Sequence, residues 1–179
     1  YRTHGWARRG TKVHGKIAGN HKKGRINLIM AQRGKEWLAP LTFTGSCHHD
    51  FVTGWFEQCL IPELKPNSLV IIDNAPFHNK ADIKAALEKH GHTLLPLPTY
   101  SPDFNPIEKY WSWLRRHLLK MDLADLANKR KVPSKAQYRS RVATVMQTKK
   151  SKEVARSIMQ NFRKHCEKVK NAGGRAVKG

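Results

Sequence analysis

Short apolar runs separated by polar turns dominate the first half of the chain. The runs INLIMAQ at 26–32 and WLAPLTF at 37–43 flank Arg33-Gly34-Lys35, the pattern of two antiparallel strands joined by a tight turn. Between Asp50 and Leu64, apolar side chains recur at three-to-four spacing, which indicates a helix. We therefore expect a β-hairpin followed by a helix.

A strand, a helix and a second strand are predicted between residues 68 and 98. The segment SLVIID at 68–73 is apolar enough for a buried strand, and HTLLPLP at 92–98 predicts another. Between them, NKADIKAALEKHG at 79–91 predicts an amphipathic helix that ends at Gly91, the residue type expected after a helix C-terminus. Such a unit implies a right-handed crossover and parallel pairing of its two strands.

The second half of the chain is predicted to be mainly helical. Asn105 is a good N-cap, Pro106 suits the first helical position, and Glu108 stands three residues after the cap. An apolar stripe follows on one face of this helix. Further helices are expected at about 135–147 and 151–169, before a glycine-rich, basic end that we expect to be mobile. The order of elements predicts an α/β fold.

Charge is distributed unevenly along the 179 residues, which hold 34 Lys and Arg against 13 Asp and Glu, a net charge of +21. Residues 1–35 contain ten basic and no acidic side chains, and residues 120–179 contain seventeen and four. Two basic flanks around a near-neutral centre indicate a polyanionic partner, most simply nucleic acid. Candidates for contact with phosphates near the N-terminus are Arg8, Arg9, Lys12, Lys22, Lys23 and Arg25.

The cysteines and the lack of a long apolar run limit the setting of the protein. No run approaches the roughly 20 residues that cross a bilayer, so no membrane is expected. The start lacks an initiator Met and a signal-peptide core, which suggests a non-secreted piece of a longer chain. Three cysteines form no disulfide framework and favour a reduced, cytosolic setting. Cys47, His48, His49 and Cys59 are ligand-type side chains, but their spacing fits no familiar zinc site, and buried thiols and surface histidines are the preferred interpretation.

Two carboxylates are the candidates for chemistry. Asp73 directly follows an apolar strand, where open parallel sheets bind ligands. Glu108 follows after one helix, one strand and a proline-rich loop, and this connection returns it to the same edge of the sheet. Two facing carboxylates need a cation, and Mg²⁺ or Mn²⁺ prefers oxygen ligands. Each acid also has a local alternative: Asp73 could begin an Asx turn, and Glu108 could form a capping box with Asn105.

Two motifs surround these acids: VIIDNAPFH at 70–78 and LLPLPTYSPDFNPIEKYWSWLRR at 94–116. They resemble the catalytic region of bacterial insertion-sequence transposases of the mariner-like DDE superfamily, and HGWARRG at 4–10 resembles a further segment of that family. The resemblance implies a ribonuclease-H-like mixed sheet flanked by helices. It places a partial catalytic domain over 1–120 and a basic helical tail over 121–179.

The resemblance also implies roles for single residues. Asp73 and Glu108 match the second and third catalytic acids, which would hold two Mg²⁺ or Mn²⁺ ions for cleavage and joining of DNA. Asn74, His78 and Asn105 would be supporting residues. The family's first Asp lies on a strand that precedes HGWARRG and runs through the middle of the sheet, and this chain lacks it. We therefore expect an incomplete sheet and an incomplete catalyst, completed by a missing N-terminal part or a second copy.

Three functions follow as hypotheses. The leading one is a transposase that cuts and joins DNA at terminal repeats and a target, in the bacterial cytoplasm with the nucleoid. The second is a fragment that only binds DNA, and the third is a nuclease or phosphatase of the same fold acting on RNA. Magnesium-dependent nicking that is lost in Asp73→Ala would support the first. Salt-sensitive binding without nicking would support the second, and an RNA hybrid substrate distinguishes the third.

Overall fold

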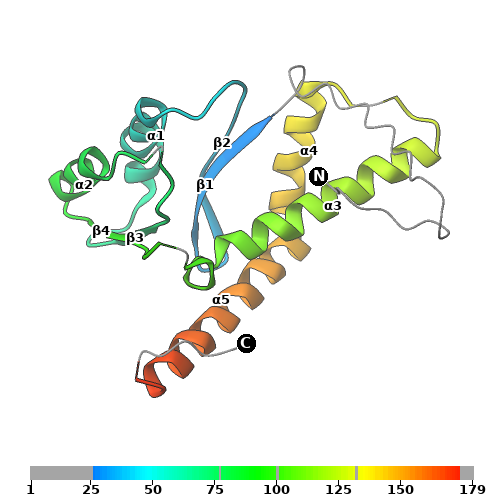
Figure 1. Cartoon of the computed structure of the whole chain (residues 1–179). Helices are drawn as coiled ribbons and strands as arrows, with labels where there is room; N and C mark the ends of the chain where they lie inside the picture. The colour runs from blue at the N-terminus through cyan, green and yellow to red at the C-terminus, as the bar shows by residue number, and fades with distance from the viewer. Residues whose placement is uncertain (1–25, 77, 100, 132, 174–179) are drawn as a thin grey trace, which may run out of the picture.

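The computed structural model describes residues 26–76, 78–99, 101–131 and 133–173, drawn in colour in Figure 1. Its main elements are β1 (Asn27–Arg33), β2 (Glu36–Phe43), α1 (His49–Trp55), β3 (Leu69–Ile72), α2 (Lys80–Lys89), β4 (Thr93–Pro96), α3 (Ile107–Ala127), α4 (Lys135–Gln147) and α5 (Lys149–Asn171). No helix within these ranges has the length and apolar character needed to cross a membrane. The predicted phosphate contacts from Arg8 to Arg25 lie outside the described residues.

The predicted β-hairpin and the helix after it are confirmed. β1 and β2 pair in antiparallel fashion, and the turn between them contains Gly34 with a φ of 58°, a left-handed conformation that suits glycine. Beside the turn, Arg33 forms an ion pair with Glu36 at 3.0 Å. α1 continues into a π-helical turn, Phe56–Leu60, and a 3-10 turn, Ile61–Glu63, so the predicted helix is three consecutive helical segments.

β3 and β4 pair in parallel through all four residues of each strand, as the crossover rule predicts. The connecting α2 begins at the N-cap Asn79, whose side chain accepts a hydrogen bond from the Asp82 N–H. It is followed by Gly91, at a φ of 74°, which lets the chain turn back toward β4. Ile83 and Leu87 of α2 are fully buried, so this helix covers one face of the parallel pair.

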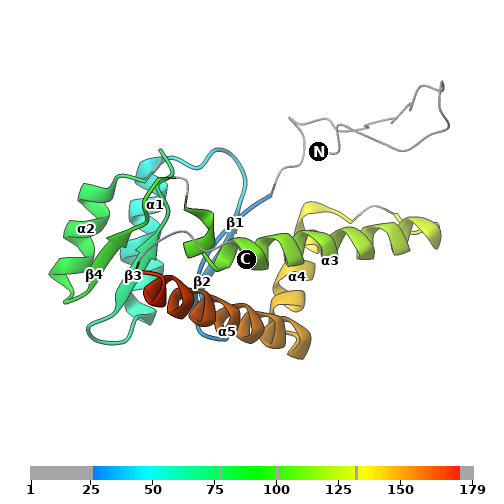
Figure 2. The same ribbon diagram turned by 60° about the horizontal axis from the view of Figure 1, so that its bottom comes forward.

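Two hydrophobic clusters hold the described chain together. The first joins α1, its continuation and α2 to β2, β3 and β4, around buried residues such as Val52 and Leu60. The second joins α3, α4 and α5 to the hairpin through Met30 and Trp37. In Figures 1 and 2, α1 and α2 accordingly lie at one end of the molecule and α3 and α4 at the other. The described part of the basic tail, 121–173, therefore packs on the rest of the chain. α3 runs without a break through residue 120, the boundary expected between the catalytic domain and the tail.

The α4 helix is fixed at its start and along its side. Ser134 and Gln137 form a capping box, in which each side chain bonds the backbone N–H of the other residue. The guanidinium of Arg141 on α4 donates to Asp122 and Asp125 on α3, at 2.8 and 2.5 Å. This pairing holds the pKa of Asp125 below its usual value, with the hydrogen bond from Arg141 as the main cause.

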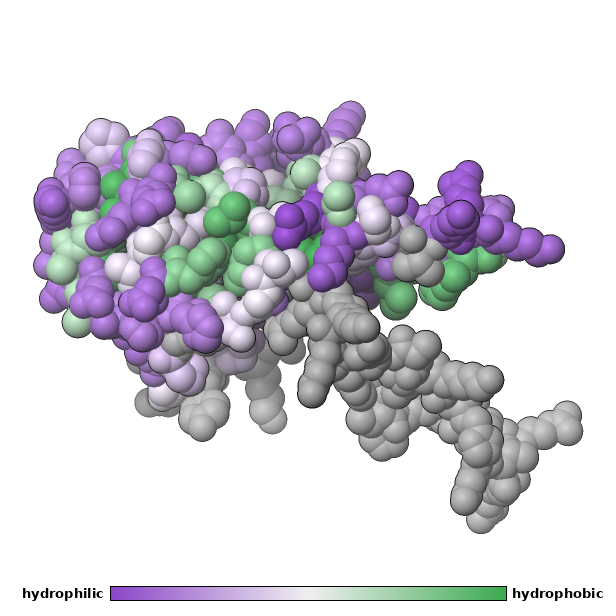
Figure 3. Space-filling view, turned by 90° about the horizontal axis from the view of Figure 1, so that it is seen from above, coloured by the Kyte–Doolittle hydropathy of each residue, from purple (hydrophilic) through white to green (hydrophobic). Residues whose placement is uncertain are grey.

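The described strands form two separate two-stranded sheets, β1–β2 and β3–β4, and no described strand pairs with both. This agrees with the expected incomplete sheet, while the ribonuclease-H-like arrangement stays a prediction. The β3–β4 sheet also leaves one face uncovered, because Leu69, Ile71 and Leu95 remain 56%, 45% and 45% exposed. Hydrophobic patches interrupt the otherwise hydrophilic surface in Figure 3.

The start of α3 also differs from the prediction. Pro106, and not Asn105, occupies the N-cap position, and no side chain caps this helix. Instead, the Glu108 N–H donates to the Asn105 carbonyl and the Lys109 N–H to the Pro106 carbonyl, both at 3.2 Å. Backbone carbonyls thus accept the first hydrogen bonds of α3, and the predicted cap by the Asn105 side chain is wrong.

Candidate active site

Asp73 stands immediately after β3, at the carboxyl end of the parallel pair. Its Oδ1 accepts a hydrogen bond from the Ala75 N–H at 3.1 Å, the Asx turn considered as its local alternative. The same oxygen lies 3.3 Å from Nδ1 of His78, whose side chain is 13% exposed. These two contacts orient the Asp73 carboxylate through Oδ1. Its side chain is 43% exposed, which leaves Oδ2 accessible to a ligand.

Burial and a nearby carboxylate act in opposite directions on His78. Burial lowers the pKa of His78 below its usual value, and the Asp73 carboxylate opposes that shift only in part. The neutral form of His78 is therefore favoured, and it can orient the Asp73 side chain without adding a positive charge.

Glu108 is the second residue of α3 and follows the 3-10 turn Pro102–Phe104. Its side chain forms no capping box, since α3 has no side-chain cap, so this local alternative is not observed. Glu108 is exposed to solvent. The carboxylate is therefore available at the start of the helix, where the helix dipole favours negative charge.

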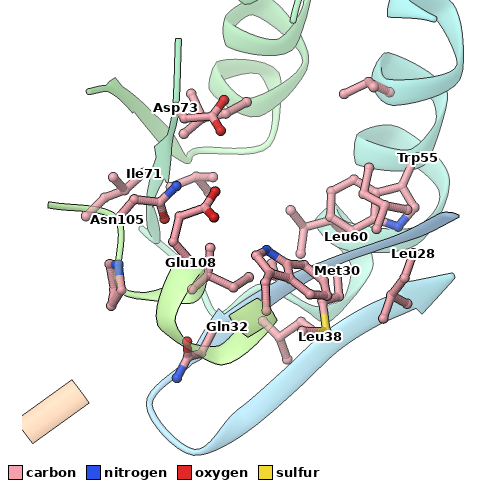
Figure 4. Close-up of a pocket in the computed structure, with 18 of the residues that line it drawn as sticks. Leu28, Met30, Gln32, Leu38, Trp55, Leu60, Ile71, Asp73, Asn105 and Glu108 are labelled. Atoms are coloured by element: carbon pink, nitrogen blue, oxygen red, sulfur yellow. The ribbon is translucent and has the colours of Figure 1, made fainter. Parts of the chain in front are cut away.

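The structure brings Asp73 and Glu108 to one cavity of about 800 Å³. Figure 4 shows Asp73, Asn105 and Glu108 together at one end of this cavity, with both carboxylates directed into it. His78 also lines the cavity, and no other Asp or Glu of the described residues does. Of the supporting residues, only Asn74 is outside the lining, and it is exposed. The connection through α2 and β4 thus returns the chain to the edge where Asp73 lies.

Strand edges border much of this cavity. Every residue of 26–33, which includes β1, and every residue of 68–73, which includes β3, contributes to the lining. Successive side chains of a strand point to opposite faces, so a lining by consecutive residues means that the edge of each strand is turned toward the cavity. β1 pairs only with β2, and β3 only with β4, among the described residues. The cavity therefore lies between two strand edges that lack a partner.

Part of α5 approaches the site, which the sequence did not indicate. Met159 and Phe162 line the cavity, and the ring of His165 lies 5.7 Å from the ring of Phe104, directly before Asn105. These three residues of α5 recur at three-residue spacing on its apolar face. The spacing of these side chains in the sequence indicates an apolar face on the helix, but it does not identify the element against which that face packs.

The second group of ligand-type side chains forms no metal-binding group with the two acids among the described residues, although Cys47 also lines the cavity. Cys47 and Cys59 pack against the first hydrophobic cluster, and burial raises the pKa of the Cys47 thiol. His48 and His49 are exposed. Within the described ranges, no group of three or more His, Cys, Asp or Glu side chains could hold a metal ion. Among the described residues, the carboxylates of the candidate site are therefore those of Asp73 and Glu108.

Comparison with known proteins gives the family. Residues 1–129 match the model of the DDE superfamily endonuclease family. The chain is also 31% identical over 106 residues to the transposable element Tcb1 transposase of Caenorhabditis briggsae, a match that covers 59% of this chain and 35% of that protein. The chain thus spans about a third of that relative's length, and no solved structure matches it. With most of its length matched by the family model, the chain belongs to the DDE superfamily of endonucleases.

Proposed function

We propose that the chain is the catalytic part of a transposase that cleaves and joins DNA phosphodiesters with the help of divalent metal ions. The observation that carries the proposal is the convergence of Asp73 and Glu108, far apart in sequence, on one cavity at the carboxyl end of β3. Membership of an endonuclease superfamily and the likeness to a protein named a transposase support it. A bacterial insertion sequence as the source, and a cytoplasmic location with the nucleoid, remain parts of this proposal.

The donor atoms fit Mg²⁺ or Mn²⁺. Asp73 and Glu108 provide hard carboxylate oxygens, and the Asn105 amide lies beside them (Figure 4). Oxygen ligands of this kind suit Mg²⁺ and Mn²⁺. When bound, two such ions would supply activation of a water or 3′-hydroxyl and stabilisation of the leaving oxygen.

The chain's own residues would prepare the site for this chemistry. His78 and the Ala75 N–H fix one oxygen of Asp73, so the carboxylate needs little reorganisation when it takes up a ligand. Glu108 is held by the first turn of α3, whose position is fixed by the fully buried Tyr110. Both acids thus project from packed elements, which is the requirement for a precise site.

A third acid is needed from a segment that enters the cavity between β1 and β3. The two unpaired strand edges there offer backbone N–H and C=O groups, which a strand between them would satisfy on both sides. A strand parallel to β3 would end at the same edge of the sheet as Asp73, so an acid at its end would join the pair. We propose that this strand is supplied by an N-terminal part of the transposase or by a second copy.

Metal binding tests the acid pair without requiring catalysis. Binding of Mn²⁺ to the full chain, followed by electron paramagnetic resonance, should weaken by at least about tenfold in Asp73→Asn and in Glu108→Gln, since even changes to residues around ligands cost about 10–100-fold. Asp103→Asn is the matched control, because Asp103 is exposed in the adjacent 3-10 turn but does not line the cavity. Equal Mn²⁺ affinity in all four proteins would overturn the proposed pair.

Addition of a peptide tests the third acid. A synthetic strand of alternating Val and Thr that ends in Asp should raise the Mn²⁺ affinity of the chain and permit Mg²⁺-dependent nicking of terminal-repeat DNA. The same peptide ending in Asn should occupy the cavity without either effect. If both peptides bind and neither changes the metal affinity, the third acid does not come from this position.

A DNA-binding fragment without catalysis is the second candidate. It is favoured because Asp73 and Glu108 are the only acids among the described residues that line the cavity. It predicts salt-sensitive binding of DNA that is the same with and without the Asp-ending peptide, and no nicking in either case. The two candidates therefore separate in the peptide experiment.

A further inference from the structure

α5 has a strongly basic exposed face in addition to the apolar face that reaches the cavity. Its exposed basic residues are Lys149, Lys150, Lys152, Arg156, Arg163, Lys164, Lys168 and Lys170. Only two acids, Glu153 and Glu167, lie on the same helix. The helix therefore presents a large excess of positive charge to solvent.

Five of these cations lie along one line. Lys149, Arg156, Arg163 and Lys170 recur every seven residues, and Lys152 follows Lys149 by three. Because seven residues make about two turns of an α-helix, these side chains share one side of α5, here named the α5 stripe. At 1.5 Å per residue, the stripe is about 32 Å long, close to the roughly 34–36 Å of one turn of B-DNA.

The α5 stripe forms no ion pairs within the described structure. None of its five side chains takes part in one there, in contrast to Arg141 of α4, which pairs with two aspartates of α3. Glu153 and Glu167 follow Lys149 and Arg163 by four residues and lie on the same side of the helix, so this side carries five basic and two acidic side chains. The remaining excess of positive charge is available to an external anion.

The helix that carries the stripe also reaches the carboxylate site. His165 lies beside Phe104, and Phe162 lines the cavity that contains Asp73 and Glu108. Arg163 directly follows Phe162, but successive residues of an α-helix point about 100° apart, so the stripe lies on a different side of α5 from the face that lines the cavity. A polyanion held along the stripe would consequently lie on the outer side of the helix whose apolar face borders the cavity.

We infer that the α5 stripe binds the phosphate backbone of double-helical DNA, on the outer side of the helix whose apolar face lines the cavity of Asp73 and Glu108. The inference rests on the proposed function for the identity of the polyanion. Exposed Lys and Arg side chains neutralise phosphates and release counterions, which yields binding that depends on salt and not on sequence. The stripe would thus add affinity for the DNA and leave the choice of cleavage position to other contacts.

The test removes three charges from the stripe and three from elsewhere. Arg156→Gln/Arg163→Gln/Lys170→Gln is the test variant of the full chain. Lys65→Gln/Lys84→Gln/Lys89→Gln is the control, with the same loss of net charge from exposed positions outside α5. Binding of a fluorescent 30-base-pair duplex is measured by anisotropy at several salt concentrations without divalent metal.

The salt dependence decides the result. Each lost phosphate contact lowers the slope of log affinity against log salt by about 0.9, so the test variant should lose about 2.7 and the control close to none. Between 50 and 200 mM salt, the loss of affinity should accordingly be about 40-fold smaller in the test variant than in the original chain. Equal slopes in the two triple variants would overturn the inference, since net charge alone would then explain binding.

A further arm tests which kind of polyanion the stripe binds. Polyglutamate in place of DNA should bind far more weakly. If it binds as well as the duplex and loses the same slope in the test variant, the stripe recognises acidic proteins and the inference fails. Failure of nicking with intact stripe-dependent binding would count against the proposed function alone.

Discussion

A buried hydrogen bond between α3 and α5 offers a quantitative test of how the two helices are held together. The Tyr110 hydroxyl and Ser151 Oγ lie 2.7 Å apart, and both residues are 0% exposed. Tyr110→Phe keeps the ring but leaves the Ser151 hydroxyl buried without this partner. An unsatisfied buried hydroxyl costs about 1–3 kcal/mol, and we expect a loss of about 2 kcal/mol in the free energy of unfolding.

The size of that loss sets the expected thermal shift. A domain of 150–250 residues loses about 2–4 °C in Tm for each kcal/mol, so Tyr110→Phe should lower Tm by about 6 °C. The double variant Tyr110→Phe/Ser151→Ala removes both polar groups and should recover most of the stability. Urea denaturation followed by tryptophan fluorescence is a suitable assay, since Trp37 lies against Tyr110 with ring centroids 3.8 Å apart.

The comparison between single and double variants can refute this reasoning. If Tyr110→Phe stays within about 0.5 kcal/mol of the original chain, the Ser151 hydroxyl has another partner and the bond does not hold the helices together. If the double variant is no more stable than the single one, the loss comes from packing around the ring and not from the unsatisfied hydroxyl.

Two further predictions concern α4. Ser134→Ala removes the capping box with Gln137 and should cost about 1 kcal/mol in unfolding free energy, measured by urea denaturation, whereas Ser134→Asp should retain most of the cap. Arg141→Gln removes the partner that lowers the pKa of Asp125. A carboxyl group whose pKa is lowered by folding stabilises the fold above its unfolded-state pKa of about 3.9, and this stabilisation is lost as the pH falls. In Arg141→Gln, the free energy of unfolding should therefore depend less on pH below about 4 than in the original chain.

Local signals in the sequence predicted most elements correctly. The apolar run before Asp73 became β3, and the Asn79 cap and Gly91 enclose α2 as expected. These features depend on neighbours within a few residues, which a sequence states directly. The convergence of Asp73 and Glu108 also followed from the sequence, because a parallel crossover returns the chain to one edge.

Non-local contacts were predicted only in part. The separation of β1–β2 from β3–β4 agrees with the incomplete sheet that the family resemblance implied, although no local pattern in residues 26–96 expresses it. The approach of α5 to Phe104 was not predicted, since amphipathic spacing reveals an apolar face but not its partner. Asn105 is a residue type that often caps helices, but here it ends the preceding 3-10 turn and its side chain does not cap α3.

The exposed edges of β1 and β3 have a consequence for handling the protein. An unpaired strand edge is a template on which another polypeptide can pair, and it is a common starting point for aggregation. Leu69 and Ile71 add apolar surface at one of these edges, which strengthens that tendency. Purified alone, the chain should form concentration-dependent oligomers, and a ligand that occupies the gap should return it to a dispersed, monomeric state.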